Sequence, residues 1–325
     1  MLPGTLFALA AGLMWGLVFV VPLLLPEYPA TLLSVGRYLA FGLIALPLAW
    51  LDRARLRELT RADWIEAAKL ALIGNLLYYL LLASAIQRAG GPLPTVIIGT
   101  LPVVIAIVSN VRDVRRDGRL PWGRLAPSLL LIAAGIGLVN QVELAALAAQ
   151  PDASIGRYAL GALLAVGAVA CWTWYPIRNA DWLRAHADRS PRTWATAQGV
   201  ATLPLAAIGL ALYLAVAAAQ GRDLAGAALG PRPADFLLLM FATGLLASWL
   251  GTLCWNEASQ RLPTTLVGQL IVFETLAALA YAFMLRGQMP APATLAGIAL
   301  LVAGVLWALR VRPEPPRETD AGAPH

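Results

Sequence analysis

The chain has 325 residues, of which 59% are hydrophobic and 13% are charged, and its formal net charge is +6. A soluble domain carries about 25% charged residues, so this composition excludes an ordinary soluble globular protein. Apolar runs of about 20 residues, the length that crosses a bilayer as a helix, fill almost the whole chain. We therefore predict an all-α membrane protein with ten transmembrane helices, over Gly4–Leu25, Ala30–Trp50, Trp64–Ile86, Leu93–Val111, Leu125–Gln141, Tyr158–Arg178, Pro191–Ala218, Asp235–Glu257, Leu262–Leu285 and Pro292–Val311.

The basic residues favour one side of the membrane. If the N-terminus is inside, most arginines fall in inner connections, among them the runs at 53–61 and 112–124. The positive-inside rule then predicts that both termini are cytoplasmic. Topology alone explains the net charge, so we predict no nucleic-acid partner. The segment 312–325 is rich in proline and charge, which predicts a disordered cytoplasmic tail.

Two halves of the chain resemble each other. A shift of 157 aligns Gly4, Ala8, Ala11 and Trp15 with Gly161, Ala165, Ala168 and Trp172. A shift of 169 aligns 94–135 with 263–304 without a gap, and a shift of 173 aligns 85–88 with 258–261. Because five spans is an odd number, the second copy enters the membrane inverted, which is typical of secondary transporters. We predict one domain over 1–311, with repeat one at about 1–141, repeat two at about 155–311, and a central cavity between them.

The sequence offers no catalytic or metal-binding pattern. The only histidines are His186, in a connection, and His325, and both cysteines, Cys171 and Cys254, fall inside spans. We find no HExxH motif, no paired membrane aspartates and no Ser/His set. We therefore predict no enzyme activity, no cofactor and no metal.

Charged residues inside spans are costly in lipid and usually face the interior of a bundle. Glu274, near the middle of span nine, is either a proton-coupling carboxylate or a structural group bonded to a neighbouring helix or to Arg37. Arg37, in span two, either holds a substrate carboxylate by a bidentate contact, extends to the interface or pairs with a carboxylate. Lys69 and Glu257 are interpreted as structural.

Uncharged polar residues share helix faces in two spans. Asn75, Tyr78 and Tyr79 follow an i, i+3, i+4 spacing, and Ser248 and Thr252 are four apart. Lipid tails offer such groups no hydrogen bonds, so they face either a cavity or another helix. Aromatic walls with a few polar groups suit a small amphiphilic solute. The predicted substrate-binding residues are Trp15, Arg37, Asn75, Tyr78, Tyr79, Thr100, Ser248, Trp249, Thr252 and Gln269, with Glu274 as the coupling candidate.

Several motifs resemble those of the drug/metabolite transporter superfamily, in particular its ten-helix EamA type. They are Met14-Trp15-Gly16, 255–258 (WNEA), 268–275 (GQLIVFET), Gly297 with Ala303-Gly304, and 100–103 (TLPV). Glu274-Thr275 departs from the family, which usually has a glutamate followed by a proline. Length and an aromatic-rich core are most similar to the bacterial aromatic amino-acid exporters of this superfamily.

The resemblance implies a secondary carrier in the plasma membrane, the inner membrane of a bacterium. It would export small metabolites, with amino acids as the expected substrates, by alternating access. Its expected partners are a small-molecule substrate, the lipid bilayer and possible coupling protons. Two alternatives stay open: an exporter of drugs or other lipophilic metabolites on the same fold, and a channel.

Overall fold

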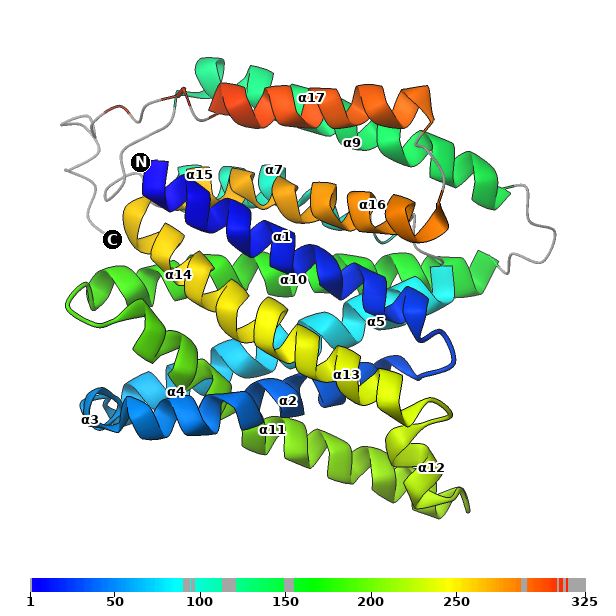
Figure 1. Ribbon diagram of the computed structural model, residues 1–325. Helices are drawn as coiled ribbons and strands as arrows, with labels where there is room; N and C mark the ends of the chain where they lie inside the picture. Colours follow the sequence, from blue (N-terminus) through cyan, green and yellow to red (C-terminus); the bar gives the residue numbers. More distant parts are fainter. Residues whose placement is uncertain are drawn as a thin grey trace.

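The computed structural model describes residues 2–89, 94, 97–112, 121–148, 155–287, 291–308, 310–311 and 314. Within this part of the chain the regular elements are α-helices and two π-helices, η1 and η2 (Figure 1). They are α1 (Leu2–Leu24), α2 (Ala30–Leu51), α3 (Arg53–Leu56), α4 (Arg61–Leu70), η1 (Ala71–Leu77), α5 (Tyr78–Ala89), α7 (Leu101–Arg112), α9 (Trp122–Ala148), α10 (Ile155–Ala185), α11 (Pro191–Ala219), α12 (Leu224–Leu229), α13 (Pro233–Thr243), η2 (Gly244–Leu250), α14 (Gly251–Arg261), α15 (Thr264–Leu270), α16 (Val272–Arg286) and α17 (Pro292–Ala308).

Six helical stretches are long and apolar enough to cross a membrane, which makes this a multi-pass membrane protein. They lie where spans one, two, three, six, seven and eight are predicted. Four shorter apolar helices occupy the places of the other predicted spans, so a complete crossing by these four stays a prediction. The six long stretches are Leu2–Leu24, Ala30–Leu51, Arg61–Ala89, Gly156–Ala185, Pro191–Ala219 and Pro233–Arg261.

The helices α1 and α10 run in opposite directions. Near the start of α1, a methyl group built on Gly4 would lie 2.9 Å from Leu262 Cγ. Near the end of α10, Arg184 donates a hydrogen bond to the Leu262 carbonyl oxygen at 2.8 Å. We call the end of the bundle with the start of α1 and the end of α10 the N-terminal face, and the other end the opposite face (Figure 1).

Two long helical stretches each contain a seven-residue π-helix near the middle. In Arg61–Ala89 it is η1, which starts at Ala71, and in Pro233–Arg261 it is η2, which starts at Gly244. These starts are 173 residues apart, the offset that also aligns 85–88 with 258–261. π-Helical turns are rare and occur frequently at functional sites.

Turns interrupt the helices of predicted spans four and nine. α7 begins at Leu101, after a turn at Gly99 and Thr100, and Pro102 occupies its first turn, where the missing N–H group of proline costs no helical hydrogen bond. In span nine, α15 and α16 are separated at Ile271, where the Glu274 N–H donates to the Ile271 carbonyl at 2.8 Å. Leu93, the predicted start of span four, lies outside the described residues.

Helix ends also differ from the predictions where polar residues continue a helix beyond its apolar run. The sixth span is predicted to end at Arg178, but α10 continues to Ala185, which puts Arg178 and Asp181 on the helix. Most of the predicted disordered tail lies outside the described residues, since only Glu314 of 312–325 is described.

Glycines let α1 and α16, and α9 and α17, approach closely. A methyl group on Gly16 would lie 2.6 Å from Ala277 Cβ, and one on Gly135 would lie 2.6 Å from the Gly297 carbonyl oxygen. Small residues at such crossings favour tight packing of membrane helices. In Figure 1, α9 and α17 form a pair along one edge of the bundle.

Candidate functional site

A small cavity lies among the middles of the helices. Its free volume is about 10 Å³, roughly the space of one water molecule. Both π-helices contribute to its wall, together with α1, α2, α5, α10, α14 and α16. The lining residues are Trp15, Val18, Arg37, Tyr38, Asn75, Tyr78, Trp172, Ala247, Ser248, Thr252 and Glu274.

Stacked aromatic rings form one side of this cavity. The Trp172 ring stacks on Tyr78 with centroids 4.8 Å apart and on Tyr175 with centroids 4.9 Å apart. The Trp15 ring meets the Trp172 ring edge-on, with centroids 5.1 Å apart. It is tilted against the Trp255 ring, with centroids 5.0 Å apart. Such arrangements hold rings in fixed orientations. The aromatic wall is therefore rigid and joins α1, α5, α10 and α14.

Arg37 is buried in the membrane-spanning region and is held by neutral groups. Its Nε donates to Ser248 Oγ at 3.0 Å and its Nη2 to the Ala247 carbonyl at 3.4 Å, so it contacts η2 twice. The guanidinium lies 4.9 Å from the ring centroids of Tyr38 and Tyr79. Among the described residues it forms no ion pair, which makes it a positive charge available to an anionic guest.

Four polar atoms on the cavity residues are buried and have no hydrogen-bond partner among the described residues. They are Arg37 Nη1, Tyr78 Oη, Trp172 Nε1 and Glu274 Oε2. Each buried polar group without a partner costs about 1–3 kcal/mol, and charged groups cost more. Native proteins rarely leave several such atoms together, and these four are the hydrogen-bonding atoms that the cavity offers to water or to a bound molecule.

The structure brings together most of the residues that the sequence predicted for the site. Seven of them line the cavity, and Tyr79 is buried behind Arg37 with its Oη 3.4 Å from the Val18 carbonyl oxygen. Trp249 faces away, and its indole N–H donates to Thr196 Oγ1 at 3.3 Å. The seven are Trp15, Arg37, Asn75, Tyr78, Ser248, Thr252 and Glu274.

Thr100 lies away from the cavity, and Gln269 cannot be placed relative to it. Thr100 is exposed in the turn before α7, where its hydroxyl donates to the Ile97 carbonyl at 2.7 Å. The side chain of Gln269 lies outside the described part of the chain. Sequence reasoning missed Tyr38 and Trp172, although the alignment of Trp172 with Trp15 in the two halves was a signal for the second.

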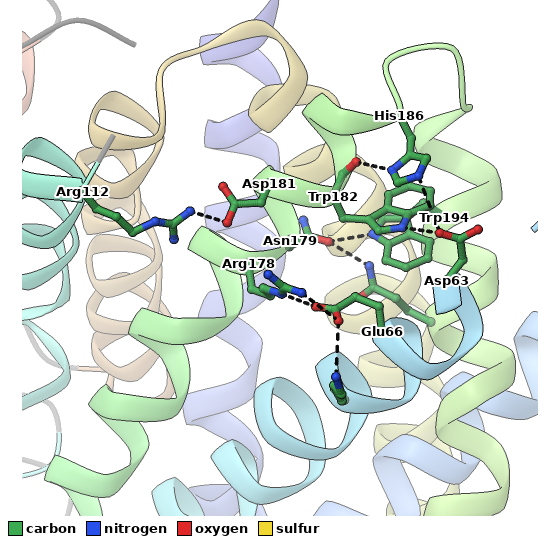
Figure 2. A network of polar contacts seen from close by, with 11 residues as sticks. Asp63, Glu66, Arg112, Arg178, Asn179, Asp181, Trp182, His186 and Trp194 are labelled. Carbon is green, nitrogen blue, oxygen red and sulfur yellow. Dashed lines mark hydrogen bonds and ion pairs between the residues drawn. The ribbon is translucent and has the colours of Figure 1, made fainter. Parts of the chain in front are cut away.

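A second polar network lies between the cavity and the N-terminal face, with Asn179 at its centre (Figure 2). Asn179 Oδ1 accepts from Trp194 Nε1 at 2.9 Å and from Gln198 Nε2 at 3.0 Å, and its Nδ2 donates to Asn256 Oδ1 at 2.8 Å. Tyr175 Oη donates to Gln198 Oε1 at 2.8 Å, which links the network to the aromatic wall. This network ties α10 to α11 and α14.

At the same end of the bundle, a stack of three aromatic rings is hydrogen-bonded to Asp63. Trp182 stacks on Trp194 with centroids 3.5 Å apart and on His186 with centroids 4.4 Å apart. Its indole N–H donates to Asp63 Oδ1 at 2.8 Å, and Asp63 also receives the Thr60 N–H in a capping box at the start of α4. The first turn of α4 is thereby fixed to the last turns of α10 (Figure 2).

Ion pairs complete the closure of the N-terminal face. Arg178 contacts both carboxylate oxygens of Glu66, at 2.5 and 3.2 Å, and Lys69 lies 3.9 Å from Glu66. Arg112, at the end of α7, pairs with Asp181 (Figure 2). Lys69 thus has a carboxylate partner, in agreement with its structural interpretation.

The described residues contain no group of three or more His, Cys, Asp and Glu side chains that could hold a metal ion. Charged residues instead gather in pairs at the N-terminal face, and Cys171 and Cys254 are free. The chemistry available in the cavity is therefore binding by hydrogen bonds, charge and ring contacts.

Comparison with known proteins assigns a family to this arrangement. The model of the EamA-like transporter family matches residues 2–112. A relative named inner membrane protein YtfF, from Escherichia coli (strain K12), is 55% identical over 316 residues, which cover 97% of this chain and 98% of the relative. The chain belongs to the EamA-like transporter family.

Membership of the EamA-like family makes the chain a membrane transporter. One solved crystal structure is similar to it with a TM-score of 0.70 and 18% sequence identity, over 94% of this chain and 96% of that one. At that identity the likeness concerns the fold alone, and it extends over both halves of the EamA-like chain.

Proposed function

We propose that the chain is a secondary carrier that exports small metabolites, amino acids foremost, by alternating access. The cavity supports this proposal because Arg37 and Glu274 bring one cation and one anion to the same buried space. An amino acid offers a carboxylate for Arg37 and an ammonium group for Glu274, and its side chain would meet the aromatic wall. The buried polar atoms without partners carry the proposal.

The proposed architecture is ten transmembrane helices in a 5+5 inverted repeat, with both termini cytoplasmic. The opposite directions of α1 and α10, and the offset of 173 between η1 and η2, support an inverted repeat. Helix contacts support it as well. α1 packs on α14 and α16 as α10 packs on α5 and α7, while α2 packs on α11 and α9 on α17. Exchange of the halves leaves this set of contacts unchanged.

Alternating access requires the N-terminal face, which the proposed topology places in the cytoplasm, to open. The cavity has room for about one water, so an amino acid enters only when helices separate. Access from the cytoplasm needs α10 to part from α4, α11 and α14, which breaks the bonds of Asn179 and the pair of Asp63 with Trp182. We infer that this network is the cytoplasmic gate.

The relative's name supports a location in the bacterial inner membrane. Coupling to protons is proposed for Glu274, whose carboxylate is 2% exposed and has an oxygen without a partner. In this scheme, protonation of Glu274 and binding of the substrate's ammonium group exclude each other, which is the condition for exchange of a proton and a solute.

Solute counterflow with purified protein in liposomes tests the proposal. Vesicles are preloaded with one unlabelled amino acid, and uptake of labelled phenylalanine, methionine or threonine is followed with and without a pH gradient. Transient accumulation of label establishes a carrier for that amino acid. Uptake without accumulation above equilibrium indicates a channel, and no response to any amino acid, in protein shown to be folded, contradicts the amino-acid proposal.

A second candidate is export of lipophilic drugs or metabolites on the same fold. It is favoured by an apolar groove of about 860 Å³ between α2, α11, α12, α13 and η2, with Met240 and Trp249 in its wall. Trp249 is adjacent to Ser248 of the central cavity, so the groove is separated from the cavity by η2. Transport of a lipophilic cation but of no amino acid, in the same vesicles, would favour this candidate.

A further inference from the structure

A second groove, unrelated to the central cavity, lies between α7 and α10. Its volume is about 760 Å³. Apolar side chains form most of its length, and charged side chains lie at the end nearest the N-terminal face. The lining residues are Val104, Val108, Arg112, Val166, Val169, Ala170, Thr173, Trp174, Ile177, Arg178 and Asp181.

The groove changes from apolar to charged along the helix axis. On α7, eight residues separate Val104 from Arg112, about 12 Å of helix. On α10, fifteen residues separate Val166 from Asp181, about 22 Å. One leaflet of a bilayer has about 15 Å of hydrocarbon below its headgroups. The groove therefore matches the length and polarity of one leaflet, with its charged end at headgroup depth.

The charged end favours an anion. Arg178 uses Nε and Nη2 for Glu66, and the residue is exposed, as is Lys69 beside the same carboxylate. With Arg112 these make three cations against the two anions Glu66 and Asp181. Basic pockets between helices on the cytoplasmic side are typical binding sites for phosphate headgroups.

A polar atom lies between the charged and the apolar parts of the groove. Thr173 Oγ1 is buried and has no hydrogen-bond partner among the described residues. It precedes Arg178 by five residues, about 7.5 Å along the helix. That spacing is similar to the separation of the phosphate and the ester carbonyls in a glycerophospholipid. The Thr173 side chain lines the groove, so rotation about its Cα–Cβ bond turns this covered hydroxyl towards a ligand that has a hydrogen-bond acceptor below its charge.

We propose that the α7/α10 groove is a binding site for a glycerophospholipid. The phosphate contacts Arg112 and Arg178, and an acyl chain lies along Val108 and Val169. After rotation of its side chain, Thr173 donates a hydrogen bond to an ester carbonyl. The site depends on neither the identity nor the transport of the solute, so it stands or fails separately from the proposed function.

Photo-crosslinking in vesicles tests this site. The full-length protein is reconstituted with phosphatidylglycerol that carries a diazirine in one acyl chain, and labelled peptides are mapped after illumination. We expect labelling to concentrate on 104–112 of α7 and 166–178 of α10. Diacylglycerol with the same chain, which lacks the phosphate, is expected to label these peptides about fivefold less, since a basic contact to a headgroup is worth about that factor.

Two pairs of variants locate the contacts. Ala170→Phe fills the groove and keeps every ion pair, whereas Ala207→Phe places the same ring on the exposed face of α11. Arg178→Gln removes a proposed phosphate contact, and Arg55→Gln removes an exposed arginine that pairs with Asp52 at the same end. We expect Ala170→Phe and Arg178→Gln to reduce labelling of α7 and α10, and both controls to leave it unchanged.

Several outcomes would overturn the site. Equal labelling of all lipid-facing helices, or labelling unaffected by Ala170→Phe, means ordinary boundary lipid. Equal labelling by diacylglycerol removes the phosphate contact from the proposal. Loss of labelling on addition of an amphiphilic transported solute, with no effect of headgroup, assigns the groove to that solute instead. Because Ala170→Phe leaves the Glu66 pairing intact, a folding defect in Arg178→Gln does not prevent the test.

Discussion

The central cavity and the network around Asn179 are neighbours in the bundle, but they differ in how completely their polar groups are hydrogen-bonded. In the network, Asn179 uses both its carbonyl and its amide, and Gln198 bonds on both sides. In the cavity, seven residues or about two turns away from Asn179 along α10, the indole N–H of Trp172 has no partner among the described residues. Arg37 Nη1 and Glu274 Oε2 also lack a partner there.

The contrast is between polar groups that hold helices together and polar groups that, under the proposed function, form hydrogen bonds with the transported solute. A satisfied buried network specifies one arrangement of its helices. A cluster of buried polar atoms without hydrogen-bond partners lowers the stability of the fold. Such a cluster is retained where a ligand or a proton supplies the hydrogen bonds. Substitutions in the two regions are therefore expected to differ in stability and in transport.

The largest effect is expected for Asn179→Leu, compared with Asn75→Leu in the cavity. The first removes the shared partner of Trp194, Gln198 and Asn256, and should lower the free energy of unfolding by about 3–5 kcal/mol. Asn75 has no side-chain hydrogen bond to another described residue, so Asn75→Leu should cost less than about 1 kcal/mol. Denaturant unfolding in detergent micelles measures both, and equal losses would remove the distinction between the two regions.

Glu274→Gln should affect transport more than stability. The substitution removes a desolvated carboxylate, but it also removes the anion that shares the cavity with buried Arg37, so the free energy of unfolding should change by less than about 2 kcal/mol in either direction. Transport should lose its response to a pH gradient while exchange of unlabelled for labelled solute continues. If uptake driven by the gradient persists in the variant, Glu274 has a structural role and the coupling proposal is wrong.

Two tyrosines allow the same comparison for a single hydroxyl group, one with a hydrogen-bond partner and one without. Tyr175→Phe removes the bond to Gln198 and should cost about 1 kcal/mol. Tyr78→Phe removes a hydroxyl that has no partner and should change stability by less than about 0.5 kcal/mol. Its effect should appear in the affinity for the transported solute, measured by counterflow over a range of concentrations. The reverse order of stabilities would contradict the assignment.

The smallest effect is expected at the opposite face, where charges are exposed. Arg232 donates to Glu27 at 2.6 Å and lowers the pKa of Glu27 below its ordinary value of 4.5. A lowered carboxyl pKa stabilises the fold above pH 4.5, and this contribution disappears as the pH falls through the folded-state pKa. Arg232→Gln should reduce this small acid dependence of the melting temperature, and high salt should weaken it in the wild type. A dependence that is unchanged in the variant would assign it to other carboxylates.

Much of the fold follows from hydropathy, because six apolar stretches are long enough to leave no other reading. The breaks in spans four and nine do not follow from hydropathy, because apolar residues flank them on both sides. Pro102 is the one sequence signal of the break in span four. The C-terminal end of α10 does not follow from hydropathy either. Asp181 and Arg184 look like loop residues in a hydropathy pattern, whereas in the bundle they find partners on other helices and extend α10.

Part of the site follows from helical spacing, and the limit of that method is visible in one pair of neighbours. Spacing groups residues on one face of their own helix but does not say how the helix is rotated in the bundle. Ser248 faces the cavity and Trp249 faces the apolar groove, about 100° apart on the helix. Thr100 is predicted in the site because it precedes Pro102, but in the structure it lies in a turn and is exposed.

The π-helices have a consequence for how this helix bundle tolerates change in length. A π-turn accommodates an additional residue within an α-helix, so η1 sets the angular phase between α4, with its contacts at the N-terminal face, and α5, with Tyr78 and Tyr79. Loss of one residue in 71–77 would leave a helix able to form regular α bonds. It would also turn α5 by about 100° relative to α4. This rotation takes Tyr78 out of the cavity wall and Tyr79 from its place behind Arg37, while Asp63 and Glu66 keep their partners.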